Sequence, residues 1–204
     1  MNLLFDIFQG IGVALAIGIR PFFPSLAVTL LAAVGAETHI EGTRFAFVHT
    51  SFSFLQSLPF LLILFVCGVA LIAMDGGPWG ERLRSRTGMT TLACISLVLG
   101  ALIVGGAFRH THEEVVIGIV VGVAFSALGI AGSWPFFERL RARLQPEAAA
   151  VGIPVIAEST AVIVAIASVL LPPLGPVAVA ALLVLMWRGR GRGEQKYAGL
   201  RILR

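Results

Sequence analysis

Three segments of the chain are long, apolar and free of charge: residues 55–74, 89–108 and 115–137. A helix of about 20 apolar residues spans the hydrocarbon core of a bilayer, so each segment is long enough to cross a membrane. The chain of 204 residues is 57% hydrophobic and only 13% charged, whereas a soluble domain carries about 25% charged residues. We therefore predict an all-α integral membrane protein that forms a single transmembrane domain over residues 1–204.

Most of the fifteen basic residues fall into three groups between or after the apolar segments. The groups are Arg82, Arg84 and Arg86; Arg139, Arg141 and Arg143; and Arg188, Arg190, Arg192, Lys196, Arg201 and Arg204. The four histidines lie in the gaps between these groups. Because cytoplasmic loops carry an excess of Lys and Arg, we predict that the basic groups are cytoplasmic, with residues 191–204 as a basic tail. The histidine-bearing segments would then lie outside.

The C-terminal apolar region contains a turn. Residues 159–187 carry no charge, but the run PPLGP interrupts them. Proline removes a helix hydrogen bond and clashes with the preceding turn, so we predict a hairpin that turns at PPLGP and returns the basic tail to the cytoplasm. Its first arm begins near Ile153, which places Glu158 inside the membrane.

The apolar N-terminal region is interrupted by Arg20. Two full spans here would reverse every later loop and put the first basic group outside. We therefore predict one span over residues 3–20, followed by a half-helix from Pro21 to about Gly35 that does not cross. This gives six transmembrane helices with a half-helix after the first, and both termini are cytoplasmic.

A pattern in the sequence repeats at a spacing of 114 residues. Gly18, Pro21, Phe22, Phe23, Leu26 and Leu30 correspond to Gly132, Pro135, Phe136, Phe137, Leu140 and Leu144. A three-span unit that is repeated once must be inverted in the membrane, because three is odd, and inverted repeats with broken helices recur in transporters. The halves would be residues 1–110 and 111–190. The alternative is a chance similarity between two apolar segments.

Arg20 stands directly before Pro21 in the run GIRPFFP. Proline suits the first turn of a helix, and a helix N-terminus has unpaired N–H groups and a partial positive charge. Arg20 and the helix start at Pro21 together predict a binding site for a phosphate or a carboxylate. The alternative is an arginine that extends to the membrane interface.

Glu158 is a carboxylate within a predicted span, where a charge costs roughly 2.5 kcal/mol or more near the centre. It either handles a proton or a cation, helped by Ser159 and Thr160, or lies shallow enough for water to reach it. In the predicted topology Arg20 lies in the opposite leaflet, so we do not expect a direct pair between Arg20 and Glu158.

The predicted outer loops hold a candidate metal site formed by His39, His110, His112 and Glu113. Imidazole and carboxylate groups are ligands of zinc and similar ions, although solvated loops also need polar residues. The sequence contains no Gly-rich phosphate loop with Lys, no HExxH and no CxxC motif. It therefore predicts neither an enzyme nor a cofactor, and the absence of interleaved basic and aromatic residues argues against a nucleic-acid partner.

Three stretches of the chain, GIGVALAIGIRPFFPSL, GIPVIAESTAVIVAIASVLLPP and the tail KYAGLRILR, carry a resemblance to a known family. They resemble a family of small bacterial membrane proteins catalogued as domain of unknown function 4126. The resemblance involves both ends of the chain. It implies a multi-pass protein of the bacterial inner (plasma) membrane and assigns no activity to any residue.

Taken together, these features predict a transporter or lipid-type translocase for an anionic or amphipathic substrate. Arg20 and Pro21 would form the anion site, and Glu158 would be the coupling carboxylate, with Ser159 and Thr160 beside it. Two alternatives stay open: a non-transporting structural subunit of a larger membrane complex, and a divalent-metal-binding membrane protein that uses the outer His/Glu loops. Membrane lipids are expected partners, and the glycine-rich spans are compatible with a homo-oligomer or a larger complex.

Overall fold

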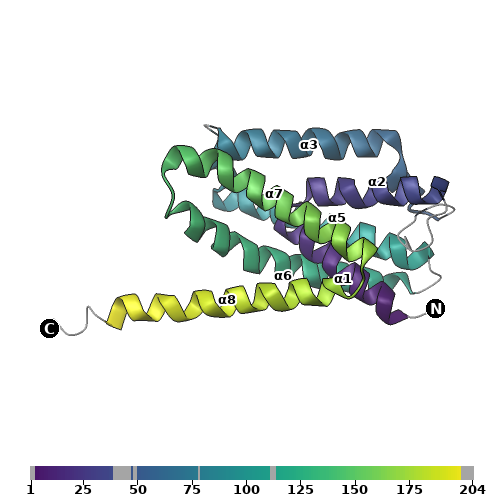
Figure 1. Cartoon of the computed structure of the whole chain (residues 1–204). Coiled ribbons are helices and arrows are strands. Elements are labelled where there is room, and N and C mark those ends of the chain that lie inside the picture. Colours follow the sequence, from purple (N-terminus) through teal and green to yellow (C-terminus); the bar gives the residue numbers. More distant parts are fainter. Residues whose placement is uncertain (1–2, 39–46, 48–49, 78, 111–113, 199–204) are drawn as a thin grey trace.

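The computed structural model describes residues 3–38, 47, 50–77, 79–110 and 114–198, and within these ranges all regular structure is helical (Figure 1). The helices are α1 (Leu3–Ile19), α2 (Phe22–Thr38), the 3-10 helix η1 (Ser53–Gln56), α3 (Leu58–Gly76), α4 (Gly80–Leu83), α5 (Arg86–His110), α6 (Val115–Arg141), α7 (Pro146–Leu170) and α8 (Leu174–Ala198).

Four of the described helices are long and apolar enough to cross a membrane, which fits a helical membrane protein. These segments are Leu58–Gly76, Arg86–Arg109, Val115–Arg141 and Val151–Leu170. The first three coincide with the charge-free segments of the sequence. The turn at PPLGP is also confirmed, because α7 ends at Leu170 and α8 begins at Leu174. Three further apolar helices are shorter: Leu3–Ile19, Phe22–Gly35 and Leu174–Gly189.

Helix α1 lies at the centre of the bundle and packs against α5, α6, α7 and α8. All its residues from 12 to 19 are buried. The backbones of α1 and α6 touch because Gly18 has no side chain: a Cβ atom there would lie 2.2 Å from the carbonyl oxygen of Ser126. The Ser126 hydroxyl donates a hydrogen bond to the carbonyl oxygen of Ala14 at 3.0 Å. Close packing of this kind is the role that small residues have between membrane helices.

The chain reverses direction between α1 and α2 at Arg20 and Pro21. Proline has no N–H to donate and disfavours a helical conformation in the residue before it, so α1 ends at Ile19 and α2 starts afresh. The reversal lies inside the bundle, because Gly18 packs against Gly129 of α6. Helix α6 continues for twelve residues beyond that point, which is about 18 Å at 1.5 Å per residue.

Helices α1 and α2 thus form a hairpin that enters the bundle from one end and turns back within it (Figure 1). The predicted arrangement, a complete span over residues 3–20 followed by a half-helix that does not cross, is therefore wrong. The start of α1 and the end of α8 lie at opposite ends of the bundle (Figure 1), so the structure does not support six spans with both termini on one side. Irregular backbone at such a depth is tolerated where protein surrounds it or where it lines a cavity.

The inverted relation between the two proposed halves is also wrong. Gly10 lies near Val121 and Ala14 near Ser126, so the contacts advance in the same direction along α1 and α6. The two helices run parallel because an even number of long helices, α1, α2, α3 and α5, precedes α6. The second copy of the pattern also differs locally: α6 continues through Pro135, with α8 packed against it on both sides of the proline.

Candidate functional site

The tip of the α1–α2 hairpin meets three other parts of the chain near one end of the bundle. We call this the basic end: α3 and α6 end there and α5 begins there, so the first two basic groups of the sequence lie there. Arg20 extends from the hairpin tip toward this end. The residues that it meets are the last turn of α3, the segment after α4 and the last turn of α6.

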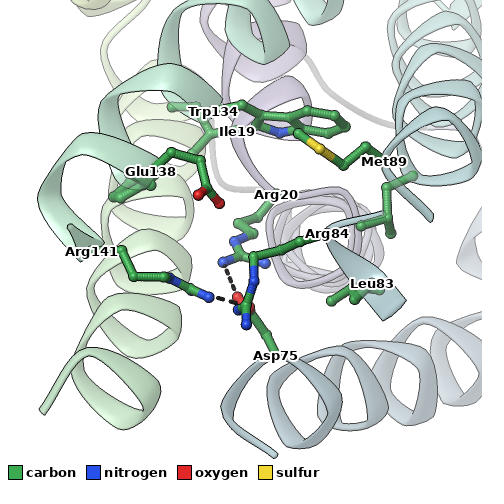
Figure 2. Close-up of a pocket in the computed structure, with 11 residues that line it drawn as sticks. Ile19, Arg20, Asp75, Leu83, Arg84, Met89, Trp134, Glu138 and Arg141 are labelled. Atoms are coloured by element: carbon green, nitrogen blue, oxygen red, sulfur yellow. Dashed lines mark hydrogen bonds and ion pairs between the residues drawn. The ribbon is translucent and has the colours of Figure 1, made fainter. Parts of the chain in front are cut away.

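Three guanidinium groups converge on the carboxylate of Asp75 (Figure 2). Arg20 Nη2 donates to Asp75 Oδ2 at 2.7 Å, and Arg84 Nη1 and Arg141 Nη2 both donate to Oδ1 at 3.1 Å. The Asp75 side chain is 5% exposed, and the side chains of Arg20, Arg141 and Arg84 are 12%, 18% and 30% exposed. Charge-assisted hydrogen bonds of this kind are about twice as strong as neutral ones, so Asp75 joins the end of α3 to the hairpin tip, the segment after α4 and the end of α6.

The position of Asp75 explains why it needs so many cationic partners. It lies in the last turn of α3, where the partial negative charge of the helix end disfavours a carboxylate. The chain then turns through Gly77 and Gly80 before Arg84 returns to the carboxylate. A Cβ atom on Gly80 would lie 2.9 Å from Arg84 Nη2 and 2.8 Å from the carbonyl oxygen of Asp75. A larger residue at position 80 would therefore displace the Arg84 guanidinium.

A pocket of about 70 Å³ lies beside this carboxylate, and we call it the Asp75 pocket. It is lined by Ile19, Arg20, Asp75, Leu83, Arg84, Met89, Leu92, Trp134, Phe137, Glu138 and Arg141. Figure 2 shows the arginines and Asp75 on one side of the pocket, and Met89 and Trp134 on another. The pocket has a charged wall next to an apolar one, and it is large enough to hold several waters or a small anionic group.

Glu158 lies close to Arg20 but does not line the pocket. Its side chain is 6% exposed, and Oε1 is 3.9 Å from Arg20 Nε. Neither carboxylate oxygen has a hydrogen-bond partner in the part of the chain that the structure describes. The prediction that Arg20 and Glu158 lie in opposite leaflets is therefore wrong. The reason is the hairpin: Arg20 is at its tip, deep in the bundle, and not at the far end of a complete span.

The other residues predicted to bind the substrate have different positions. Pro21 is buried, and its effect is to break the helix between α1 and α2. Its carbonyl oxygen accepts a hydrogen bond from the Ser25 hydroxyl at 2.5 Å. Ser159 and Thr160 are exposed on α7, whereas Glu158 is buried, so they do not join the site. In the structure Arg20 pairs with the carboxylate of Asp75, and its burial does not fit the alternative of an interfacial arginine. A site for a separate phosphate or carboxylate at Arg20 and Pro21 stays a prediction.

The predicted metal site falls mainly outside the described residues. His39, His112 and Glu113 lie outside them, and only the backbone of His110 is described. Within the described part of the chain, no three His, Cys, Asp or Glu side chains are grouped so that they could hold a metal ion. The metal site remains a prediction.

Sequence reasoning did not identify Asp75, Arg84 and Arg141 as site residues. The two arginines were noticed only as indicators of orientation. One feature of the sequence could have pointed to Asp75 as a site residue. It is the first charged residue after a charge-free segment, and it stands just before a basic group. A signal of that kind does not show which arginines reach the carboxylate, because they are 9, 55 and 66 residues away.

Comparisons with known proteins do not add a relative. No family model matches the chain, and no significant match was found among the curated proteins or the solved structures. The resemblance to domain of unknown function 4126 therefore stays a prediction.

Proposed function

We propose that the protein is a transporter or lipid-type translocase for an anionic or amphipathic substrate, and that the Asp75 pocket receives the charged part of this substrate. The observation that carries the proposal is the convergence of three guanidinium groups on one carboxylate at a pocket. The planar fork of a guanidinium group suits the oxygens of phosphate, sulfonate and carboxylate groups.

An unpaired donor in the cluster supports an anionic ligand. The three arginines are matched by the carboxylates of Asp75 and Glu158 and by that of Glu138, an exposed residue that lines the same pocket. The Nε atom of Arg141 is buried without a hydrogen-bond partner among the residues that the structure describes, and a buried N–H donor without an acceptor is costly. An anion in the pocket would supply the missing acceptor.

The wall of the pocket supports an amphipathic ligand. Met89, Leu92 and Trp134 line it together with the charged residues. Binding sites for small molecules commonly combine an apolar lining with a few polar groups that fix orientation. A charged headgroup with an apolar chain would use both parts of the lining.

The proposal includes an orientation in the bacterial inner membrane. The excess of arginine at the basic end would place this end in the cytoplasm. The hairpin of α1 and α2 would then enter from the outside, and its tip would meet a pocket that faces the cytoplasmic side. A substrate would thus reach Arg20 from the cytoplasmic side, and the hairpin would separate it from the other side.

Binding can be measured through Trp134, which lines the pocket. In a Trp79→Phe/Trp187→Phe background it is the only tryptophan. We expect its fluorescence to respond to methanesulfonate, a free oxyanion, or to dihexanoyl phosphatidylglycerol, a soluble acidic lipid, but not to dihexanoyl phosphatidylcholine. Arg141→Gln should weaken binding about tenfold or more, because it removes a charge-assisted hydrogen bond. Arg143→Gln is the matched control, since Arg143 is exposed.

Transport can be measured in liposomes that contain the purified protein. One assay follows the uptake of radiolabelled methanesulfonate, and the other follows the exchange of fluorescent phosphatidylglycerol between leaflets by dithionite quenching. The first assay detects transport of a free anion and the second detects movement of a lipid headgroup. Equal activity of Arg141→Gln and Arg143→Gln would argue against the Asp75 pocket. No binding and no transport of either probe would favour a structural subunit.

A further inference from the structure

Glu158 is a buried carboxylate. Anion binding in the Asp75 pocket does not explain why it is there. It lies on α7 within the apolar segment Val151–Leu170. Both of its oxygens are buried, and within the described ranges of the chain neither has a hydrogen-bond partner. The nearest cationic atom is Arg20 Nε at 3.9 Å, which is beyond hydrogen-bond distance. A buried ionised carboxylate is costly unless it is paired and hydrogen-bonded, and a protonated carboxyl group is much less so.

Arg20 is shared between two unequal carboxylates. Its Nη2 atom donates to Asp75 at 2.7 Å, whereas its Nε atom is 3.9 Å from Glu158. Asp75 has two further guanidinium partners, and Glu158 has no other cation within 4.0 Å among the described residues. The carboxylate that can lose its charge at the smaller cost to the cluster is therefore Glu158.

The charged groups around Glu158 are few. Among the described residues, Arg20 at the hairpin tip and Asp75 at the end of α3 are the charged groups that act on it. Helix α2 carries no charged residue over positions 22–35, and α8 carries none before Arg188. The charged groups at the end of α6, Glu138 and Arg141, belong to the lining of the Asp75 pocket.

We propose that Glu158 takes up one proton when an anion enters the Asp75 pocket, so that a proton and the anion bind together. This inference rests on the proposed function of the pocket. The proton comes from water and forms an O–H bond on a Glu158 carboxylate oxygen. Glu158 then no longer attracts Arg20, whose guanidinium is left to Asp75 and the anion. A monoanion replaces the negative charge that Glu158 loses, so the net charge of the cluster is the same before and after binding.

The proposal predicts a link between pH and anion affinity. The probe is methanesulfonate, a monoanion that does not titrate near neutral pH, and the readout is the fluorescence of Trp134 in the single-tryptophan background. While Glu158 is ionised, the affinity of the wild-type site should rise by up to about tenfold for each unit of decrease in pH, because one proton is bound with each anion. Glu158→Gln should bind the anion with an affinity that does not depend on pH.

Glu138→Gln is the matched control for this experiment. Glu138 lines the pocket but is exposed, so its removal makes the same change of charge without removing a buried proton site. We expect this variant to keep the pH dependence. Proton uptake by the wild-type protein, measured with a pH electrode in weak buffer as methanesulfonate is added, gives a test that does not depend on the folding of Glu158→Gln.

The outcomes separate this inference from the proposed function. Anion binding that is independent of pH and takes up no proton would overturn the role of Glu158 but leave the Asp75 pocket as an anion site. A pH dependence that persists in Glu158→Gln would likewise exclude Glu158 as the proton site. No binding at any pH in the wild-type protein would overturn both proposals.

Discussion

The substitution Asp75→Asn should destabilise the fold strongly. Asparagine keeps the shape of the side chain but removes the negative charge that holds Arg20, Arg84 and Arg141 together. Breaking a buried ion pair by removing one partner costs about 3–5 kcal/mol. The arginines are partly exposed, which lowers the cost, and we expect a loss of about 3 kcal/mol. For a chain of this size such a loss lowers Tm by on the order of 10 °C.

The measurement is thermal unfolding of the purified protein in detergent, compared with two other variants. Arg84→Gln removes the most exposed of the three arginines and should cost about 1 kcal/mol or less. Glu138→Gln removes an exposed carboxylate from the same pocket and should have a still smaller effect. Because Asp75 and Arg84 are in contact, their effects should not be additive, and the double variant should be more stable than the sum of the single losses predicts.

Two results would refute this reasoning about Asp75. One is a loss of stability in Asp75→Asn no larger than that in Arg84→Gln. The other is strict additivity in the Asp75→Asn/Arg84→Gln variant. It would mean that removal of one arginine does not reduce the positive charge that Asp75→Asn leaves uncompensated.

Two further predictions concern packing and topology. Gly18→Ala should destabilise by about 1–3 kcal/mol or more, because its Cβ would lie 2.2 Å from the Ser126 carbonyl oxygen. In contrast, Gly152→Ala should be neutral or stabilising by up to about 1 kcal/mol, since nothing lies within 4 Å of its Cβ; equal unfolding temperatures would contradict the close packing of α1. Single cysteines at Leu3 and Ser85, in a background without the native cysteines, should react with an impermeant maleimide from opposite sides of the membrane. Labelling of both positions from the same side would contradict the hairpin.

Apolar length and proline placement were sufficient to predict most of the helices. The segments that became α3, α5 and α6 contain about 20 or more consecutive uncharged residues, and a polypeptide of that composition has few alternatives to a buried or membrane-spanning helix. The break before α2 and the turn before α8 follow from prolines, whose effect on the backbone is local. Arg20 was identified as a site residue for the same reason, since it directly precedes one of these breaks.

The depth of that break could not be derived from the sequence. A 17-residue apolar helix such as α1 is equally compatible with a short span and with one arm of a hairpin that turns inside the bundle. The packing of Gly18 against Ser126 and Gly129 decides between them, because it places Gly18, two residues before Arg20, about 18 Å before the end of α6. The error about α1 then produced the errors about the termini, the repeat and the distance between Arg20 and Glu158.

By itself, then, the sequence determined the helical membrane type of the protein, the positions of most turns and one arginine of the site, because those properties depend on neighbouring residues. Only the tertiary structure decided which charges meet. Asp75 joins arginines from the hairpin tip, from the segment after α4 and from the end of α6. No local pattern encodes that meeting, since it results from how four separate parts of the chain pack together. The same packing leaves both carboxylate oxygens of Glu158 buried without a hydrogen-bond partner among the described residues.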